Sequence, residues 1–310
     1  MSTQTLTPDR PQAAPSPPGE KSQFLMAGLA VVVCGATAWS AGFFSPETSF
    51  GTQVRATPTA RQDHVSHEGP LSGPQAAALC GRLIEEGVTA VAEVKDFRAT
   101  FYSQQRVRDR LKEPETTQIK MRAEPRSVYM KWAEPKKGRE LLWNKDAHDG
   151  ELLIHECGWK GKIAPLVKIA PDHRLVAESC RRGIHEVGLW NLMTLIAKNR
   201  PLLNNPGVEV ELTTDKSIGD RACYCFTIKM PEPTQEIPHY LVSLYLDKER
   251  KLPLGCEIYE APNEAGGEPQ LCESYFYENL ELNVGLTDLD FDHTNPDYCF
   301  GNGDATTDIP

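Results

Sequence analysis

A nearly unbroken run of alternating side chains over residues 97–157 constrains the fold of this chain more than any other feature. Phe97 and Ala99 alternate with Arg98 and Thr100, which is the period of two expected for a β-strand with two different faces. Four more candidate strands follow, at residues 116–122, 127–132, 140–143 and 152–157. Prolines and an Asp-Gly pair separate them, and both are typical of strand ends and hairpin turns. The sequence therefore predicts one wide, curved antiparallel sheet.

The second half of the chain adds helices and further strands. Apolar residues at helical spacing predict helices over residues 74–94 and 184–199. The second helix is apolar around most of its circumference, which indicates burial on more than one side. Residues 158–171 are expected to form an apolar loop or a short helix, and residues 175–177 a strand. Further strands are predicted at residues 208–213, 222–228, 239–246, 254–260 and 271–282.

Composition limits the classes of partner. The chain has 310 residues with a hydrophobic content of 40%, enough to build a sizeable core. Its net charge of −10 argues against a nucleic-acid partner, which requires a basic surface.

The cysteines suggest disulfide bonds. Eight of the nine cysteines follow Cys34, an even number that suits disulfides in an oxidising compartment. If the hairpin around residues 263–268 is symmetric, Cys256 and Cys272 lie nearly opposite each other, and a disulfide between them is geometrically feasible.

The N-terminal quarter predicts export from the cytoplasm. Residues 1–23 form a proline-rich tail that we expect to be disordered. Residues 24–44 carry no charge and reach the ~20 residues of a membrane-spanning helix. They are interpreted as an uncleaved signal-anchor, with a signal peptide cleaved after Ala38 as the alternative. A flexible linker at 45–73, a β domain at 74–300 and a disordered tail at 301–310 complete the expected organisation.

The sequence motifs that could indicate catalysis or metal binding are incomplete. His185-Glu186 begins like a helical zinc motif, but Leu189 stands where the second histidine is needed. His155 and Cys157 share a strand face, although a buried or disulfide-bonded Cys157 is the simpler interpretation. Residues 288–292 begin like a calcium loop and then depart from it. No catalytic residue, metal site or cofactor is therefore predicted.

The architecture instead suggests a hydrophobic cavity. A curved sheet beside a helix with two apolar sides is suited to enclosing an apolar ligand. The alternative is that the same side chains fill an ordinary core. The predicted cavity-lining residues are Phe101, Met130, Trp132, Trp143, Leu189, Trp190, Met193 and Ile196.

Two segments carry a resemblance to known families. Residues 124–132 (Glu-Pro-x-Ser-Val-Tyr-Met-Lys-Trp) and 135–140 (Pro-x-x-Gly-Arg-Glu) resemble an uncharacterised family of exported bacterial proteins, domain of unknown function 1571. The longer pattern from Phe97 to Asp149-Gly150 resembles the LolA and LolB type of outer-membrane lipoprotein carrier. The likeness covers about residues 75–300.

The resemblance implies a mainly β (α+β) fold. This fold is an incomplete barrel of about ten or eleven antiparallel strands, with helices covering the open side. It also implies binding of acyl chains, either of a lipoprotein or of a free lipid. One position departs from the carriers, in which a basic residue before the third-strand proline helps to latch the closed form. Here Glu124 occupies that place.

The sequence therefore predicts a binding protein of the bacterial cell envelope. Its partner is expected to be a lipid or an acylated protein, and residues 24–44 tether it to a membrane with the domain in the periplasm. Secretion after signal cleavage is the alternative location. An envelope protein-interaction or sensor module of the same fold, without a lipid ligand, is the alternative function. An enzyme is not expected, because no nucleophile, base and orienting group come together.

Overall fold

The computed structural model describes residues 69–157, 166–230, 239–264 and 266–300, together with the backbone of 306–308. They all belong to one compact unit, Ser45–Pro310. The predicted tail at 1–23 and the membrane segment at 24–44 lie outside the described residues, as do most of the linker at 45–73 and of the tail at 301–310. None of the described helices combines the length and the apolar character needed to cross a membrane.

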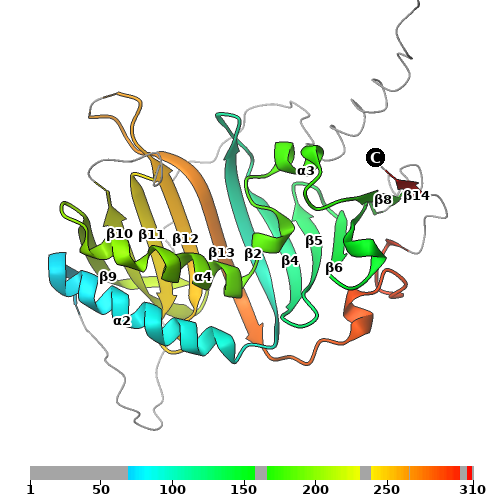
Figure 1. The fold of residues 1–310 in the computed structure, drawn as a ribbon, viewed down its shortest axis with the longest axis horizontal. Coiled ribbons are helices and arrows are strands. Elements are labelled where there is room, and N and C mark those ends of the chain that lie inside the picture. Colours follow the sequence, from blue (N-terminus) through cyan, green and yellow to red (C-terminus); the bar gives the residue numbers. More distant parts are fainter. Residues whose placement is uncertain (1–68, 158–165, 231–238, 265, 301–305, 309–310) are drawn as a thin grey trace, which may run out of the picture. The chain divides into compact units, whose positions relative to one another are not determined.

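A single open sheet of 14 strands dominates the unit (Figure 1). Its order is β1-β9-β10-β11-β12-β13-β2-β4-β5-β6-β7-β8-β14, and the short β3 pairs with β2 beside this path. Neighbours are antiparallel throughout except for β14 and β8, which are parallel. The strands on the path from β9 to β8 are β9 (Glu209–Ile218), β10 (Arg221–Lys229), β11 (Leu241–Asp247), β12 (Pro253–Glu260), β13 (Gln270–Leu282), β2 (Asp96–Val107), β4 (Glu115–Arg122), β5 (Ser127–Glu134), β6 (Glu140–Asn144), β7 (Leu152–His155) and β8 (Leu166–Ile169).

The predicted incomplete barrel is confirmed, with more strands than expected. The additional strands include three very short ones: β1 (Leu71–Ser72), β3 (Arg110–Leu111) and β14 (Thr306–Asp308). The fourth is β8, whose residues were expected in a loop or short helix. Leu166, Val167 and Ile169 are buried, and the strand pairs with β7. A four-residue segment with three apolar residues is too short to show a period of its own, so only this pairing makes it a strand.

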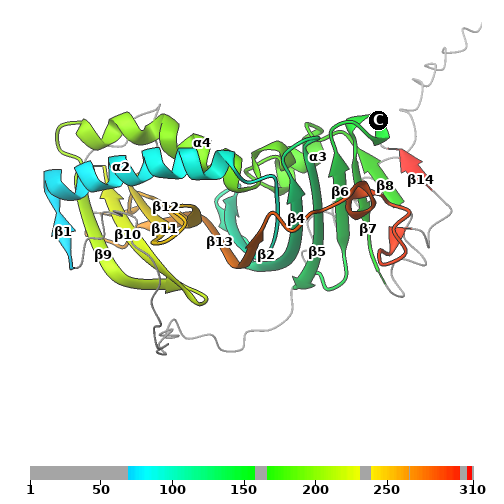
Figure 2. The ribbon, with the colours of Figure 1, turned by 90° about the horizontal axis from the view of Figure 1, so that it is seen from below.

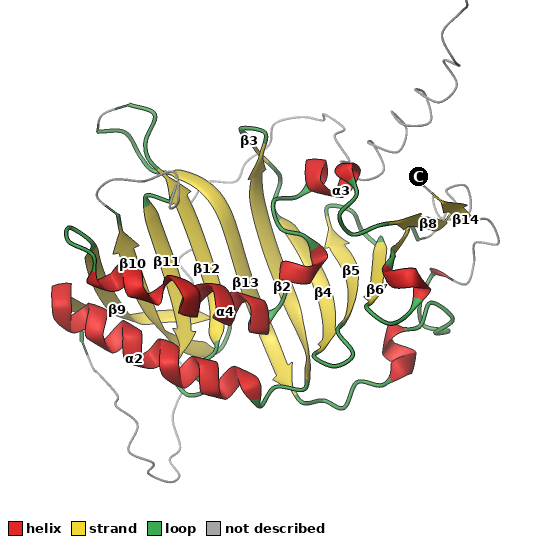
Figure 3. Cartoon of the chain, viewed as in Figure 1, coloured by secondary structure: helices red, strands yellow, loops and turns green. Residues whose placement is uncertain are grey.

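Two helices lie side by side over one face of the sheet, across the half formed by β9–β13 (Figures 2 and 3). Helix α2 (Gly73–Ala92) starts with a proline in its first turn and buries a stripe that includes Leu79, Leu83 and Val91. Helix α4 (Leu189–Asn199) packs against it. The shorter helices are α3 (Arg174–Ser179), η1 (His148–Gly150), η2 (Ile184–Glu186), η3 (Arg200–Asn204) and η4 (Asp288–Phe291).

Two predictions around α4 are corrected by the structure. The expected helix 184–199 is divided into η2 and α4, because Gly188 adopts φ +104°, a conformation that favours glycine. The expected strand 175–177 lies in helix α3. There the Nδ1 atom of His173 accepts a hydrogen bond from the N–H of Leu175, and Arg174 pairs with Glu178 one turn later at 3.0 Å.

The opposite face of strands β4–β7 is covered by residues 286–300, here called the C-terminal strap. The rings of Tyr298 and Tyr129 stack at 3.9 Å between centroids, within a buried cluster that also contains Leu142, Phe291 and Phe300. Tyr129 points away from the face that holds α4, because the preceding Val128 pairs with Met121, which lies against Gly188.

Ion pairs hold the acidic start of the C-terminal strap. Asp290 accepts a hydrogen bond from Lys120 at 2.7 Å, and Asp288 accepts one from Arg122 at 2.6 Å. The two carboxylates at the start of the calcium-like segment therefore pair with separate cations of β4.

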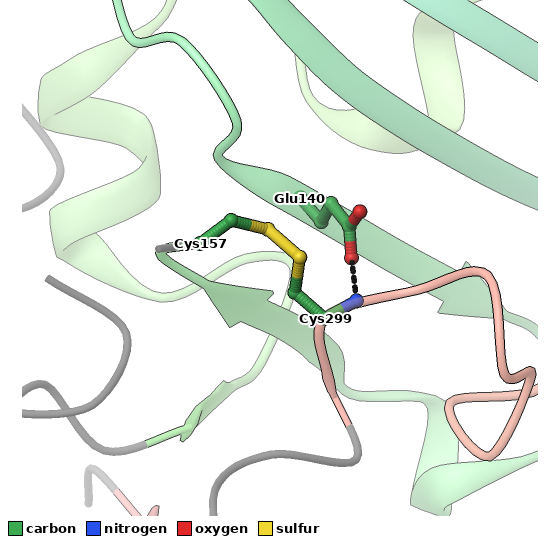
Figure 4. A group of neighbouring side chains, drawn as sticks. All are labelled: Glu140, Cys157 and Cys299. Atoms are coloured by element: carbon green, nitrogen blue, oxygen red, sulfur yellow. Dashed lines mark hydrogen bonds between the residues drawn. A yellow bond between two sulfur atoms is a disulfide. The ribbon is translucent and has the colours of Figure 1, made fainter. Parts of the chain in front are cut away.

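A disulfide between Cys157 and Cys299 fixes the end of this strap beside β7 (Figure 4). Glu140 accepts a hydrogen bond from the backbone N–H of Cys299 at 2.7 Å. The carboxylate and both sulfur atoms lie within 4.8 Å of one another. Because the sulfurs are bonded to each other, neither is available as a thiolate ligand.

The predicted disulfide between Cys256 and Cys272 is wrong in this structure, where both are free thiols. The β12–β13 hairpin is not symmetric. Cys256 lies opposite Tyr275, and the register shifts between Ile258 and Tyr259. The remaining free cysteines of the described residues are Cys80, Cys180, Cys223 and Cys225.

Candidate hydrophobic ligand site

Two adjoining cavities lie between α4 and the sheet, with volumes of about 280 Å³ (cavity A) and about 300 Å³ (cavity B). Each is near the lower end of the roughly 300–1,000 Å³ typical of small-molecule sites. Both cavities are lined by Arg182, Leu192, Leu195, Lys198, Cys256 and Ile258. Because they share these residues, the two cavities are immediate neighbours beneath α4.

The floor of the site follows from strand register. Val242 pairs with Ile258 and with Ile228, while Leu244 pairs with Cys256. Directly opposed residues on antiparallel strands share a face, so these apolar side chains form two rows across β10, β11 and β12. The roof is the side of α4 that carries Leu192, Leu195 and Ile196.

Aromatic rings and a buried ion pair form one side of cavity A. The ring of Phe101 stacks on Tyr277 and Tyr275, at 4.9 and 6.0 Å between centroids. Glu273 is almost fully buried and accepts a hydrogen bond from Arg182 at 2.8 Å. The hydroxyl of Tyr275 also donates to Glu273, at 3.0 Å. Burial first, and then the Glu273 charge, raise the pKa of Tyr275, so its hydroxyl stays protonated and can donate.

Cavity B extends the apolar lining to α2 and η3. Ile84 contributes from α2, and Leu202 and Leu203 contribute from η3. Its polar lining holds three cations, Arg182, Lys198 and Arg200, together with His239 and Asn199. The described residues that line cavity B include no aspartate or glutamate.

The predicted lining residues divide into those that reach a cavity and those that do not. Phe101 lines cavity A and Ile196 lines cavity B. Leu189 and Met193 are fully buried and line neither cavity. Trp190 donates from its indole N–H to the carbonyl of Val94 at 2.9 Å. It therefore serves as an anchor of the helix.

The other three predicted residues line neither cavity. Trp132 donates to Glu115 and Trp143 donates to the carbonyl of Gly150, while Met130 lies buried on β5. These residues belong to the β4–β7 half of the sheet, away from α4. The period-2 pattern shows which residues share a face, but not which part of that face lies under the helix.

Several residues of the site were not predicted. Leu192 and Leu195 were part of the two-sided apolar pattern of the helix, so their signal was present. The sequence alone does not show which apolar side faces α2 and which faces the sheet. Lys198, Arg182 and His239 have no local signal, because only the fold brings them to one cavity.

Arg126 is another residue that sequence reasoning missed. It follows Pro125, whereas the resemblance suggested a basic residue before that proline. Its guanidinium donates to the carbonyl of Val187 at 2.6 Å and lies 4.7 Å from the centre of the Trp190 ring. Burial lowers the pKa of Arg126. The side chain connects the β4–β5 turn to the start of α4.

The residues once considered for catalysis do not assemble. Cys157 is held in its disulfide and offers no nucleophilic thiolate. The ring of His185 packs edge-on against Trp143, at 4.9 Å between centroids. His155 is buried beside Phe300, and burial lowers its pKa.

Comparison with known families identifies the chain. The model of a family described as "Protein of unknown function (DUF1571)" matches residues 94–300. The chain belongs to this family. It is the family that residues 124–140 resemble, and the match includes all the strands from β4 to β13. No curated protein sequence matches the chain significantly.

Solved structures give weaker likenesses to this DUF1571 protein. The lipoprotein LppX from Mycobacterium tuberculosis is 10% identical with a TM-score of 0.34, over 69% of this chain and 99% of that chain. LprF from Mycobacterium bovis is 7% identical with a TM-score of 0.36, over 68% and 95%. A LolA superfamily protein from Nitrosomonas europaea is 13% identical with a TM-score of 0.28, over 69% and 97%. At TM-scores this low, the likenesses carry no functional conclusion.

Proposed function

We propose that this DUF1571 protein is a non-enzymatic binding protein of the cell envelope that holds an acyl chain, of a lipid or of an acylated protein, in cavities A and B. Residues 24–44 tether it to a membrane. The observation that carries the proposal is the pair of neighbouring cavities beneath α4, lined in common by Leu192, Leu195, Cys256 and Ile258.

The size and lining of the site suit a chain of methylene groups. Burial stabilises a hydrocarbon by about 0.8 kcal/mol per CH₂ group, so a partly enclosed chain binds well without directional contacts. The aromatic rings of Phe101, Tyr275 and Tyr277 line cavity A. Aliphatic side chains of β10, β11 and β12 line the neighbouring cavity B. An elongated apolar ligand matches this arrangement better than a compact one.

The test is photo-crosslinking of the full-length chain with a diazirine-bearing palmitate, followed by peptide mapping. We expect labelled peptides from α4 and from β12. Leu192→Asp should abolish this labelling, because it places a charge in the wall of both cavities. Val88→Asp is the matched control, since Val88 is 43% exposed on α2 and lines neither cavity.

The same experiment separates this function from the alternatives. Labelling that is absent, or that is unchanged in a folded Leu192→Asp variant, would contradict the acyl-chain proposal. It would favour the envelope interaction module, with the cavity region serving only as loosely packed core. Native mass spectrometry of the wild-type chain gives an independent reading, because a bound lipid adds its own mass.

A further inference from the structure

We propose that the ligand is an anionic amphiphile whose carboxylate or phosphate head group is held at the basic rim of cavity B, defined here as Lys198, Arg200 and His239. This inference rests on the proposed function and adds to it the charge and the orientation of the ligand. The apolar tail lies in the cavities, and the head group lies where α4 ends and η3 begins.

The first support is that the charged residues lining cavity B are positive, whereas the net charge of the chain is negative. The chain carries 43 acidic and 33 basic residues, so acidic side chains prevail over the molecule as a whole. The described lining of cavity B contains Arg182, Lys198 and Arg200 and no carboxylate. A cavity of this charge in an acidic protein favours an anion at its polar edge.

The second support is the pairing of these cations. Arg182 is neutralised by the buried Glu273, at 2.8 Å. Arg200 pairs with Glu85 at 2.6 Å, but both side chains are about half exposed, which makes this a weak pair. Within the described part of the chain, Lys198 has no carboxylate at ion-pair distance. It is exposed and lines both cavities, so its ammonium group is available to a ligand.

The third support is an unsatisfied nitrogen. The Nδ1 atom of His239 is buried and has no hydrogen-bond partner among the described residues. A buried polar atom without a partner is energetically unfavourable, and a head-group oxygen at this place would remove that cost. The charged groups around the imidazole are Glu273, Glu260, Arg181 and Arg182. Burial lowers the pKa of His239, so the neutral ring acts through hydrogen bonding and not through charge.

The arrangement also fixes which way the ligand points. Lys198 and Arg200 are exposed at the surface, whereas Leu244 and Ile258 are buried on the floor. An amphiphile satisfies both regions only with its head group at the rim and its tail on the floor.

The test is competition against the photo-crosslinking palmitate probe, with the full-length chain in one neutral detergent throughout. The competitors are palmitate, lysophosphatidic acid with the same acyl chain, and hexadecanol. We expect an anionic competitor to displace the probe at about tenfold lower concentration than hexadecanol, because only an anion can make a charge-assisted contact with Lys198. Lys198→Ala should remove most of this preference, and Lys198→Arg should restore it.

Lys137→Ala is the matched control, because Lys137 is exposed in the β5–β6 turn and lines neither cavity. A preference for palmitate supports a carboxylate head group, and a preference for lysophosphatidic acid supports a phosphate. Equal displacement by hexadecanol, or a preference that Lys198→Ala leaves intact, overturns the anionic inference while the acyl-chain function stands. Failure of the probe to label the wild-type chain overturns the proposed function itself.

Discussion

Gly87 has no side chain, and this allows α4, the roof of the ligand site, to pack closely against α2. A Cβ atom at this position would lie 2.9 Å from the sulfur of Met193 and 2.7 Å from the carbonyl oxygen of Lys251. Helix α4 and the β11–β12 turn therefore approach α2 more closely than any other residue would allow.

We expect Gly87→Ala to lower the free energy of unfolding by about 1–3 kcal/mol, because the added methyl group must displace backbone. Gly81→Ala in the same helix is the control. Its Cβ would meet only the flexible Arg200 side chain, at 3.3 Å, and alanine favours helix by about 1 kcal/mol. Urea unfolding measures both, and equal effects of the two substitutions would contradict the packing argument.

Asp247 makes the stability of the folded protein depend on pH in the acidic range. Burial acts to raise its pKa, but hydrogen bonds from Arg221 and from the backbone N–H groups of Arg250 and Glu249 outweigh burial and lower it. A carboxyl whose folded pKa is depressed stabilises the fold above its unfolded pKa of about 3.9. This stability is lost as the pH falls through the lower, folded pKa.

Asp247→Asn should therefore destabilise the protein by about 3 kcal/mol near neutral pH, since it removes the charge that faces Arg221. The difference between variant and wild type should shrink as the solution is acidified. Denaturant unfolding across a pH series measures this, and a constant difference at all pH values would exclude the linkage.

At the scale of elements, the junction between the β4–β5 turn and α4 depends on Arg126. Its contacts to the Val187 carbonyl and the Trp190 ring join two segments that are 61 residues apart. Arg126→Ala should speed amide hydrogen exchange around 187–193 by about tenfold or more, because a cation–π contact and a charged hydrogen bond are lost together. Arg126→Lys keeps the charge without the planar group, so we expect an intermediate effect. Unchanged exchange in Arg126→Ala would mean that the helix holds itself in place.

The C-terminal strap depends on its disulfide in the same way. Cys157 and Cys299 are separated by 142 residues, and a loop of this length contributes about 2–5 kcal/mol by restricting the unfolded chain. The double variant Cys157→Ser, Cys299→Ser should lose stability in this range. Cys180→Ser is the control, because Cys180 is free and only partly buried. Equal unfolding curves for the two variants would show that the strap is held by packing alone.

Elements with a strong internal period were predictable, and elements defined by their partners were not. Strands β2, β4, β5 and β6 and the long helix α2 carry their own alternating or helical pattern. Strand β8 and the C-terminal strap do not: the first depends on pairing with β7, and the second on a few aromatic residues such as Tyr298 that stack on a distant strand. A disulfide-bonded Cys157 was considered, but its pairing with Cys299 was missed for the same reason, because only the fold brings the two cysteines together. The site was predicted at the level of helix and sheet, and its basic rim was not.

For the whole molecule, a ligand that binds only the folded state raises its stability. If the acyl-chain proposal holds, adding palmitate to the stripped protein at about 100 times its dissociation constant should increase the free energy of unfolding by about 2.7 kcal/mol. Thermal unfolding with and without palmitate measures this change. The Leu192→Asp variant should show no response, and a wild-type chain that does not respond would contradict binding at this site.

The disulfide between Cys157 and Cys299 can form only after the segment that lines the cavities has been synthesised. Every described residue that lines either cavity comes from the covalent ring between Cys157 and Cys299, apart from Ile84 and Phe101. Synthesis runs from the N-terminus, so the ring closes only after the whole cavity-forming segment has left the ribosome and the strap has found β7. The mass of the chain changes when this disulfide forms. Measuring that mass over time therefore reports when the strap has reached β7.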